Sequence, residues 1–428
     1  MDRACGDPSA RREGVRRVLH WPPTMHCHLL VPDLFWPTAP DEGAYPHSGA
    51  GLRLPGIELL LARGRRRVDH AAPLERWVAE HYRLDGDALP LAPWRLAGEP
   101  DGAINAPPEP GLGARDHWLC VDPISLSAGS RYMTIRAADA LDLDATEAAS
   151  LIETLNRHFA LDQLQLIAPH PQRWYTACEP LDLVTRALPL VGGIIDQSAL
   201  PSGETGALWR TRITEAQMLL HEHPINQARE LRGLPPINAI WPWGLGQTHA
   251  LPPKAGETWF SDDPLLGGLA RASKARWVNQ VDAAVSPWTD ASIQHEPHHN
   301  QEEWRHGENG RGDRQEHAIH DQHERAHSHG GRVHWYHLTQ AAHAARRADR
   351  AAWNAALTDI EQRWVTPLVT ALRAGHIGML TLHAIGRSES LHAELVRNDL
   401  RRFWQRARPL SHYLAEPAPR AARPGRGQ

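Results

Sequence analysis

Five histidines lie close together late in the chain, and histidine is the side chain that most often binds transition metals. Neighbouring histidines are two, three or four residues apart. If this stretch is helical, His323 and His327 face the same side and can chelate Zn²⁺, Ni²⁺ or Cu²⁺. The alternative is a polar low-complexity loop with incidental affinity for metal, because no cysteine accompanies the histidines. The five residues are His317, His320, His323, His327 and His329.

A second group of polar residues lies in the block from His221 to Gly246, which reads HEHPINQARELRGLPPINAIWPWGLG. Asn226, Arg229 and Asn238 carry amide and guanidinium groups that suit the binding of an anionic ligand. The alternative is that these residues brace the bend at Pro224 and the turn before the strand that ends the block. The sequence leaves both interpretations open.

Tryptophan is abundant, with 17 residues against 4 phenylalanines. Exposed tryptophans bind sugars or bases by stacking, but most indole rings fill hydrophobic cores, and we favour the core interpretation. Trp241 and Trp243 alternate along a strand-like run, so we expect one ring in the core and the other facing a ligand pocket.

Composition narrows the class of protein. The chain has 428 residues, a net charge of −4 and 41% hydrophobic residues, so it can bury a sizeable core. This charge gives no reason to expect nucleic acid or a membrane as partner. Four cysteines without CxxC spacing and the lack of a long apolar run favour a cytoplasmic protein with reduced thiols. The cysteines are Cys5, Cys27, Cys120 and Cys178.

Alternating apolar runs and amphipathic stretches predict the elements that position these side chains. We expect an α/β fold with a mostly parallel sheet, because strands and helices alternate along the chain. The predicted strands are Cys27–Asp33, His117–Asp122, Leu164–Ala168, Asn238–Trp243, Val333–Leu338 and Ile377–His383. The predicted helices are Leu54–Gly64, Asp144–Phe159, Ile213–Glu222, Ala341–Arg373 and a short one around Phe403 and Trp404.

The composition also predicts how the chain is divided. Residues 1–24 are expected to be a disordered arm or a start-site extension, with translation beginning at Met1 or Met25. Residues 25–293 and 332–414 form one domain, interrupted by a His-rich disordered insertion at 294–331, which has almost no aliphatic residue. Residues 415–428 are expected to be a disordered tail.

The His221–Gly246 block resembles a signature of the archaeal-type cofactor-independent phosphoglycerate mutases. A narrower resemblance is to the RpfE-type regulatory proteins, and it covers most of residues 25–414. It implies an alkaline-phosphatase-like three-layer sandwich with a mostly parallel central sheet. The motifs that carry the narrower resemblance are PDLFWP at 32–37, DPISL at 122–126, QRWY at 172–175 and FWQRARPL at 403–410.

The resemblance implies that active members hold two divalent metals and use a Ser or Thr nucleophile for phosphoryl transfer. In this chain Asp33, His337 and Asp349 are the remnants of the metal ligands. The stretch expected to carry the nucleophile is Ala72–Arg76, which contains no Ser or Thr. We therefore assign no catalytic residue.

The resemblance thus implies a non-catalytic regulatory or binding protein on a phosphoglycerate-mutase-like scaffold. Arg346 or Arg347 beside the old metal site would repel cations, so no cofactor is expected. The implied partner is a phosphorylated small molecule or a regulatory protein. One alternative is an active mutase or metal-dependent phosphohydrolase with a rebuilt site that uses Mn²⁺ or Zn²⁺. Another is a metal-binding protein that acts through the His-rich segment.

Overall fold

The computed structural model describes eleven stretches of the chain. They are residues 25–36, 52–70, 74–84, 89–100, 116–128, 133–137, 140–188, 193–195, 197–279, 332–386 and 389–414. The predicted arm at 1–24, the His-rich insertion with its five histidines and the tail at 415–428 lie outside these residues. Among the described helices, none is long and apolar enough to cross a membrane.

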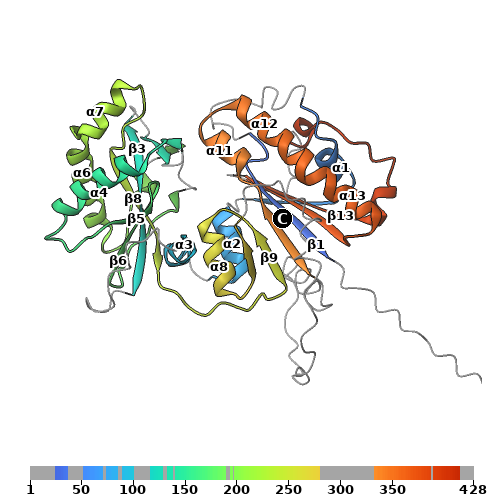
Figure 1. Cartoon of the computed structure of the whole chain (residues 1–428), viewed down its shortest axis with the longest axis horizontal. Coiled ribbons are helices and arrows are strands. Elements are labelled where there is room, and N and C mark those ends of the chain that lie inside the picture. Colours follow the sequence, from blue (N-terminus) through green and yellow to red (C-terminus); the bar gives the residue numbers. More distant parts are fainter. Residues whose placement is uncertain are drawn as a thin grey trace, which may run out of the picture.

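A seven-stranded mixed sheet forms the centre of the larger part of the molecule (Figure 1). Its first five strands pair in parallel, and its last two are antiparallel. The central strand β1 has a continuous apolar run, as expected for a strand covered on both faces. In spatial order the strands are β10 (Arg276–Val278), β9 (Glu257–Phe260), β11 (Val333–His337), β1 (His26–Pro32), β12 (Met379–Ile385), β13 (Glu389–Val396) and β2 (Arg65–His70).

Helices cover both faces of this sheet, which gives three layers (Figure 1). One face is covered by α1 (Pro55–Arg63), α11 (Gln340–Arg346), α12 (Arg350–Ile360) and α13 (Thr366–Ala374). The other is covered by α2 (Leu74–Tyr82) and α8 (Pro264–Ala272), and α3 (Ala92–Gly98) packs on α8. The predicted α/β class with a mostly parallel sheet is confirmed.

A second, antiparallel sheet of six strands lies beside the first, and the sequence did not predict it. The strand predicted at residues 238–243 belongs to this second sheet, where it pairs with β3. Helices α4 (Ala145–His158), α6 (Gly206–His221) and α7 (Pro224–Leu231) pack with it. Its strands are β3 (His117–Ala128), β4 (Met133–Ala137), β5 (Ile167–His170), β6 (Arg173–Cys178), β7 (Gly193–Ile195) and β8 (Ala239–Gly246).

The single helix predicted over residues 341–373 is wrong. The chain leaves the helix after α11, where Ala348 has a left-handed φ of 55°. Asp349 then caps α12, because its side chain accepts the amide of Ala352 at 2.9 Å. A π-helical turn at Glu361–Val365 separates α12 from α13.

The short helix predicted around Phe403 and Trp404 is also wrong. These residues lie in turns between two 3₁₀ segments, η4 (Arg397–Arg401) and η5 (Leu410–Leu414). Neither aromatic ring is buried, so helical packing gains nothing there.

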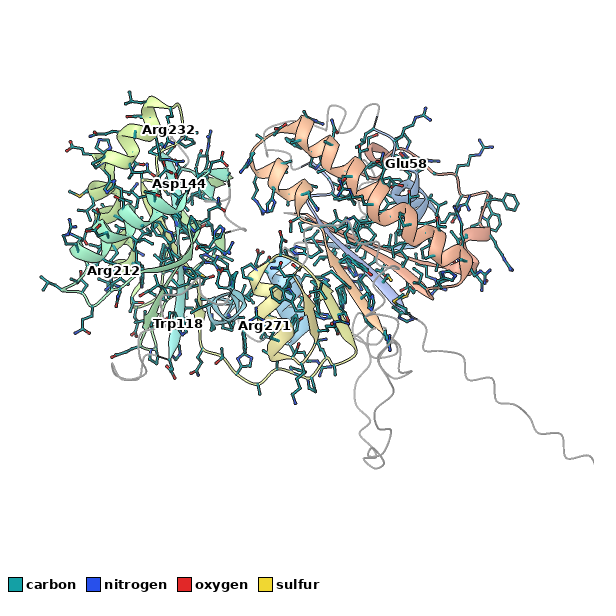
Figure 2. All side chains as sticks on the ribbon, viewed as in Figure 1. Glu58, Trp118, Asp144, Arg212, Arg232 and Arg271 are labelled. Carbon is teal, nitrogen blue, oxygen red and sulfur yellow. The ribbon has the colours of Figure 1, made fainter. Side chains whose placement is uncertain are left out.

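Helices α3 and α8 approach so closely that only glycine fits between them. A Cβ atom on Gly98 would lie 1.6 Å from the carbonyl oxygen of Pro264, and one on Gly268 would lie 1.8 Å from that of Trp94. Arg271 also donates from Nη2 to the Gly98 carbonyl, at the junction labelled in Figure 2. Since α3 also contacts the second sheet, this junction joins the two sheets into one body.

We predict that Gly268→Ala destabilises the protein by at least about 2 kcal/mol, because its methyl group meets backbone that cannot move aside. Gly267→Ala is the matched control on the same helix. Its methyl group meets the Trp277 ring at 3.0 Å, and the side chain can shift. Both variants share the helix-propensity gain of alanine, so their difference in urea unfolding isolates the contact. Equal unfolding free energies would contradict the prediction.

Candidate functional site

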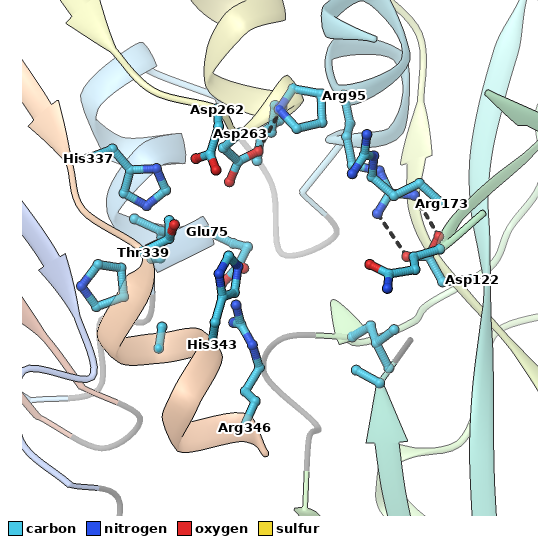
Figure 3. A pocket seen from close by; sticks show the side chains of 18 of the residues that line it. Glu75, Arg95, Asp122, Arg173, Asp262, Asp263, His337, Thr339, His343 and Arg346 are labelled. Atoms are coloured by element: carbon cyan, nitrogen blue, oxygen red, sulfur yellow. Dashed lines mark hydrogen bonds and ion pairs between the residues drawn. The ribbon is translucent and has the colours of Figure 1, made fainter. Parts of the chain in front are cut away.

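A cavity of about 420 Å³ opens where four parallel strands of the main sheet end (Figure 3). Asp33 follows β1, Asp262 and Asp263 follow β9, His337 ends β11 and Gly386 follows β12. Ligands of open α/β sheets bind in such crevices outside the carboxyl ends of the strands. The volume suits a small metabolite.

The opposite wall of the cavity comes from the second sheet and from α3. Arg95 projects from α3, and Asp122 projects from β3 (Figure 3). The hairpin between β5 and β6 contributes His170, Gln172 and Arg173, and β8 contributes Trp243. The cavity therefore lies between the two sheets and needs both.

The wall at the main sheet is acidic. Asp33, Asp262 and Asp263 line it together with Glu75 from α2. Burial raises the pKa of Glu75 to about 7; the charges of Asp263 and Asp33 add to this shift, and that of Arg346 opposes it. The carboxylates of this wall thus favour cations and hydrogen-bond donors over anions, and Arg346 offsets part of their charge.

His337 presents an unused ring nitrogen at the same wall. Its Nδ1 atom lies 3.0 Å from the Ser261 hydroxyl, and among the described residues no group bonds its buried Nε2 atom. Burial lowers the pKa of His337, although Asp263 and Asp262 oppose this shift. A neutral imidazole at the cavity wall can bond a ligand through Nε2.

The far wall rests on a buried ion pair. Two guanidinium nitrogens of Arg95 donate to the carboxylate of Asp122 at 2.6 and 2.8 Å. The indole N–H of Trp243 and the backbone amide of Trp174 donate to the same carboxylate at 2.8 and 3.1 Å. Arg95 Nε donates to the hydroxyl of Tyr175. Arg95 is therefore held rigidly, and its charge is already neutralised.

Arg173 belongs to a second ion pair beside the first. Its Nε and Nη2 atoms donate to the two oxygens of Glu99 at 2.7 and 2.8 Å. The hydroxyl of Tyr175 donates to Glu99 as well and so connects the two pairs. The Arg173 side chain is 25% exposed and lines the cavity, so a ligand would meet its remaining nitrogen, Nη1.

Of the five residues that the sequence offered as ligand contacts, the structure places only Trp243 in the cavity wall. Asn226 bonds the backbone of Leu220 and Ile237, and Asn238 bonds both backbone groups of Leu126. These amides act as braces of the turns.

Arg229 and Trp241 are also structural. Arg229 is fully buried, pairs with Glu147 of α4 and donates to the Pro235 carbonyl. Near it Arg232 reaches the same glutamate, close to the Asp144 cap of α4 (Figure 2). The buried Trp241 ring donates to the Arg186 carbonyl. These contacts match the bracing alternative.

The described residues do not fit the two-metal site that the resemblance implies. Asp33 and His337 line one cavity, but Asp349 is an exposed helix cap outside it. The described part of the chain contains no group of three or more His, Cys, Asp or Glu side chains placed to hold a metal. Arg346 instead lines the cavity and adds a fixed positive charge, whereas Arg347 pairs with Asp142.

Sequence reasoning missed most of the cavity wall. The motif Ser261-Asp262-Asp263-Pro264 does carry a local signal, because an Asp before Pro marks a helix N-terminus, and Asp263 caps α8. Arg95 and Asp122 are far apart in sequence, and neither has a local pattern that predicts their pairing. Glu75 lies in Ala72–Arg76, the stretch where the resemblance places a hydroxyl nucleophile, and only the fold shows that it faces the cavity.

Comparison with known proteins finds matching segments. No protein-family model matches the chain. A 2,3-bisphosphoglycerate-independent phosphoglycerate mutase from Methanothrix thermoacetophila is 40% identical over 53 residues, which are 12% of this chain and 14% of the relative. A protein of the same name from Methanosarcina barkeri is 29% identical over 121 residues, 26% of this chain and 29% of the relative. The matches span less than a third of either curated relative and indicate homology to cofactor-independent phosphoglycerate mutases.

Two solved structures are similar over most of the chain at low identity. The cofactor-independent phosphoglycerate mutase from Thermoplasma acidophilum DSM 1728 has 12% identity and a TM-score of 0.33, covering 87% of this chain and 90% of that one. A Pyrococcus horikoshii protein has 13% identity and a TM-score of 0.41, covering 87% and 88%.

We predict that Glu75 makes the protein less stable as pH rises. Its pKa is about 7 in the folded state against an ordinary value of 4.5, so the folded state keeps the proton longer. The loss of unfolding free energy that comes from ionising Glu75 is absent below about pH 4.5 and grows between about pH 4.5 and pH 7. Above about pH 7 the loss is complete and reaches about 3 kcal/mol. Glu75→Gln, measured by urea unfolding, should therefore stabilise the protein by about 2 kcal/mol more at pH 8 than at pH 5.

Glu80→Gln on the same helix is the control, because Glu80 is exposed and the change should leave the pH dependence unaltered. A Glu75→Gln effect of the same size at both pH values would show that Glu75 is ionised throughout.

Proposed function

We propose that this chain is a non-catalytic regulatory protein of the RpfE type that binds a phosphorylated small molecule in the cavity. The observation that carries this proposal is a retained cavity of metabolite size whose described walls hold no metal-ligand group. The homologous proteins are named as mutases of phosphoglycerate. We infer that this chain keeps the binding of a phosphorylated ligand and has lost its turnover.

The charges of the two walls orient the ligand. A phosphate group is repelled by Asp262 and Asp263 and attracted by two arginines of the cavity, Arg173 at the hairpin and Arg346 on α11. His170 and Gln172 flank Arg173 at the cavity and can donate hydrogen bonds to phosphate oxygens. We therefore expect the phosphate at the hairpin between β5 and β6 rather than at Arg346, whose charge acts on the carboxyl group of Glu75, and we expect the rest of the ligand to point to the main sheet.

The acidic wall selects the other end of the ligand. Carboxylates accept hydrogen bonds from hydroxyl or ammonium groups and repel a second carboxylate. His337 Nε2 adds one more polar contact at this wall. We therefore expect a sugar phosphate to bind more tightly than 3-phosphoglycerate, which carries a carboxylate.

The loss of turnover in this proposal rests on the described residues of the cavity. A two-metal mechanism activates a hydroxyl and neutralises the charge on the moving phosphoryl group. Helix α2 brings Glu75 into the cavity from the stretch where the resemblance places the nucleophile. Among the described residues that line the cavity, Thr339 is the one with an aliphatic hydroxyl. Thr339 as nucleophile, with a metal beside Asp33, is therefore the enzyme alternative that the described residues offer.

Calorimetric titration tests the binding. Glucose 6-phosphate should bind with the same affinity in EDTA as in Mn²⁺, and more tightly than 3-phosphoglycerate. Arg173→Gln and Gln172→Ala should each weaken binding, the former about tenfold or more because it removes a charge-assisted hydrogen bond. Arg157→Gln, an exposed residue paired with Glu153 on α4, is the control and should bind normally. Equal affinity in all variants would place the ligand elsewhere.

A coupled assay for phosphoglycerate mutase with added Mn²⁺ tests the loss of turnover, and we expect none above the buffer rate. Turnover that requires Mn²⁺ and disappears in Asp33→Ala or Thr339→Ala would establish the enzyme alternative and end the proposal of a non-catalytic protein.

A further inference from the structure

Two aromatic side chains protrude from the corner of the molecule at η4 and η5. Phe403 is 77% exposed and Trp404 is 67% exposed, whereas most of the large aromatic residues around the main sheet are buried. The two rings meet edge to face, with centroids 5.3 Å apart. Exposing two adjacent aromatic rings costs solubility and gains no folding energy, so they indicate a contact surface.

Arginines are frequent in the segment that carries this pair and in a segment beside it, although the chain as a whole has a net charge of −4. The segments 63–70 and 397–414 together hold nine arginines and two aspartates. Arg67 pairs with Asp69, and Arg402 pairs with Asp399. The nine are Arg63, Arg65, Arg66, Arg67, Arg397, Arg401, Arg402, Arg406 and Arg408.

Direct contacts place the two segments side by side. Arg63 donates to the Leu400 carbonyl at 2.6 Å, and Arg402 donates to the Arg63 carbonyl at 3.2 Å. The Arg66 guanidinium lies over the Tyr413 ring at 5.3 Å. The end of α1, the edge strand β2 and the turn between η4 and η5 thus form one basic surface, which we call the arginine corner.

We propose that the arginine corner docks on an anionic lipid surface, with Phe403 and Trp404 inserted at the boundary between headgroups and acyl chains. Aromatic rings are favoured at that depth, and arginines beside them meet the lipid phosphates. The negative remainder of the protein is repelled by the same surface, which fixes the orientation.

The shape of the corner favours a membrane over a single-stranded nucleic acid. In binding sites for single-stranded nucleic acids, the faces of aromatic side chains line a groove, and successive bases stack on them. Here the two rings are inclined at 79° on a run in which residues 401 and 403–409 are all exposed. A protruding turn of this kind suits insertion into a flat interface.

Co-sedimentation of the full chain with vesicles tests the proposal. The protein should bind vesicles made of phosphatidylcholine and phosphatidylserine, and it should not bind vesicles made of phosphatidylcholine alone. Binding should fall at high salt, because exposed charges are screened. The double variant Phe403→Ser and Trp404→Ser should lose binding at least tenfold, and Arg401→Gln or Arg406→Gln about fivefold each. All four residues are exposed, so the fold is unaffected.

Met218→Ser and Leu231→Ser are the matched controls, because these apolar residues are 74% and 91% exposed on the helices of the second sheet. They should leave vesicle binding unchanged. Equal binding to both vesicle types, equal loss in the controls, or capture of single-stranded oligonucleotides without vesicle binding would each overturn the proposal.

Discussion

The buried ion pair between Arg95 and Asp122 joins α3 to the second sheet and so holds the far wall of the cavity in place. A buried charge pair is tolerable only when further hydrogen bonds satisfy it, and here both carboxylate oxygens accept two donors each. The pair fixes α3 against β3 of the second sheet. Gly98 on α3 then packs directly on α8, which precedes β10 in the main sheet. The walls of the cavity face each other because of these two contacts.

The fold determines where the cavity lies, whereas catalysis would require particular side chains within it. The carboxyl ends of the parallel strands still converge, so Asp33 and His337 remain at one wall. Asp349, which the sequence offered as a third metal ligand, caps a helix, and Arg346 places a positive charge beside the carboxylates of this wall. Opposite them, Arg173 shares its charge with Glu99 and keeps one guanidinium nitrogen for a ligand. Such a site can orient a small molecule without a metal or a nucleophile.

The sequence predicted three of the five parallel strands, β1, β11 and β12, because these strands are buried runs rich in apolar residues, and it did not predict the shorter strands β9 and β10. It predicted three strands of the second sheet, at 117–122, 164–168 and 238–243, but not that they form a separate sheet, because the pairing of β3 with β8 spans a long sequence distance. Strand β13 does carry a period-two pattern in Leu391, Ala393 and Leu395, so it was accessible to sequence reasoning. At the site, Trp243 lines the cavity and Trp241 does not, although residues two apart on a strand lie on the same face, so alternation alone does not single out Trp243. The sequence left open whether Asn226 and Arg229 bind a ligand, because a polar side chain in a motif-rich block braces a turn as readily, and their contacts in the structure are bracing ones.

Anomalous diffraction from crystals grown with Mn²⁺ and glucose 6-phosphate distinguishes a phosphate-binding cavity from a metal site. We expect phosphate density beside Arg173 and no manganese peak near Asp33 and His337. Manganese peaks bound by those two residues, with the phosphate drawn to them, would contradict it and show a working two-metal site.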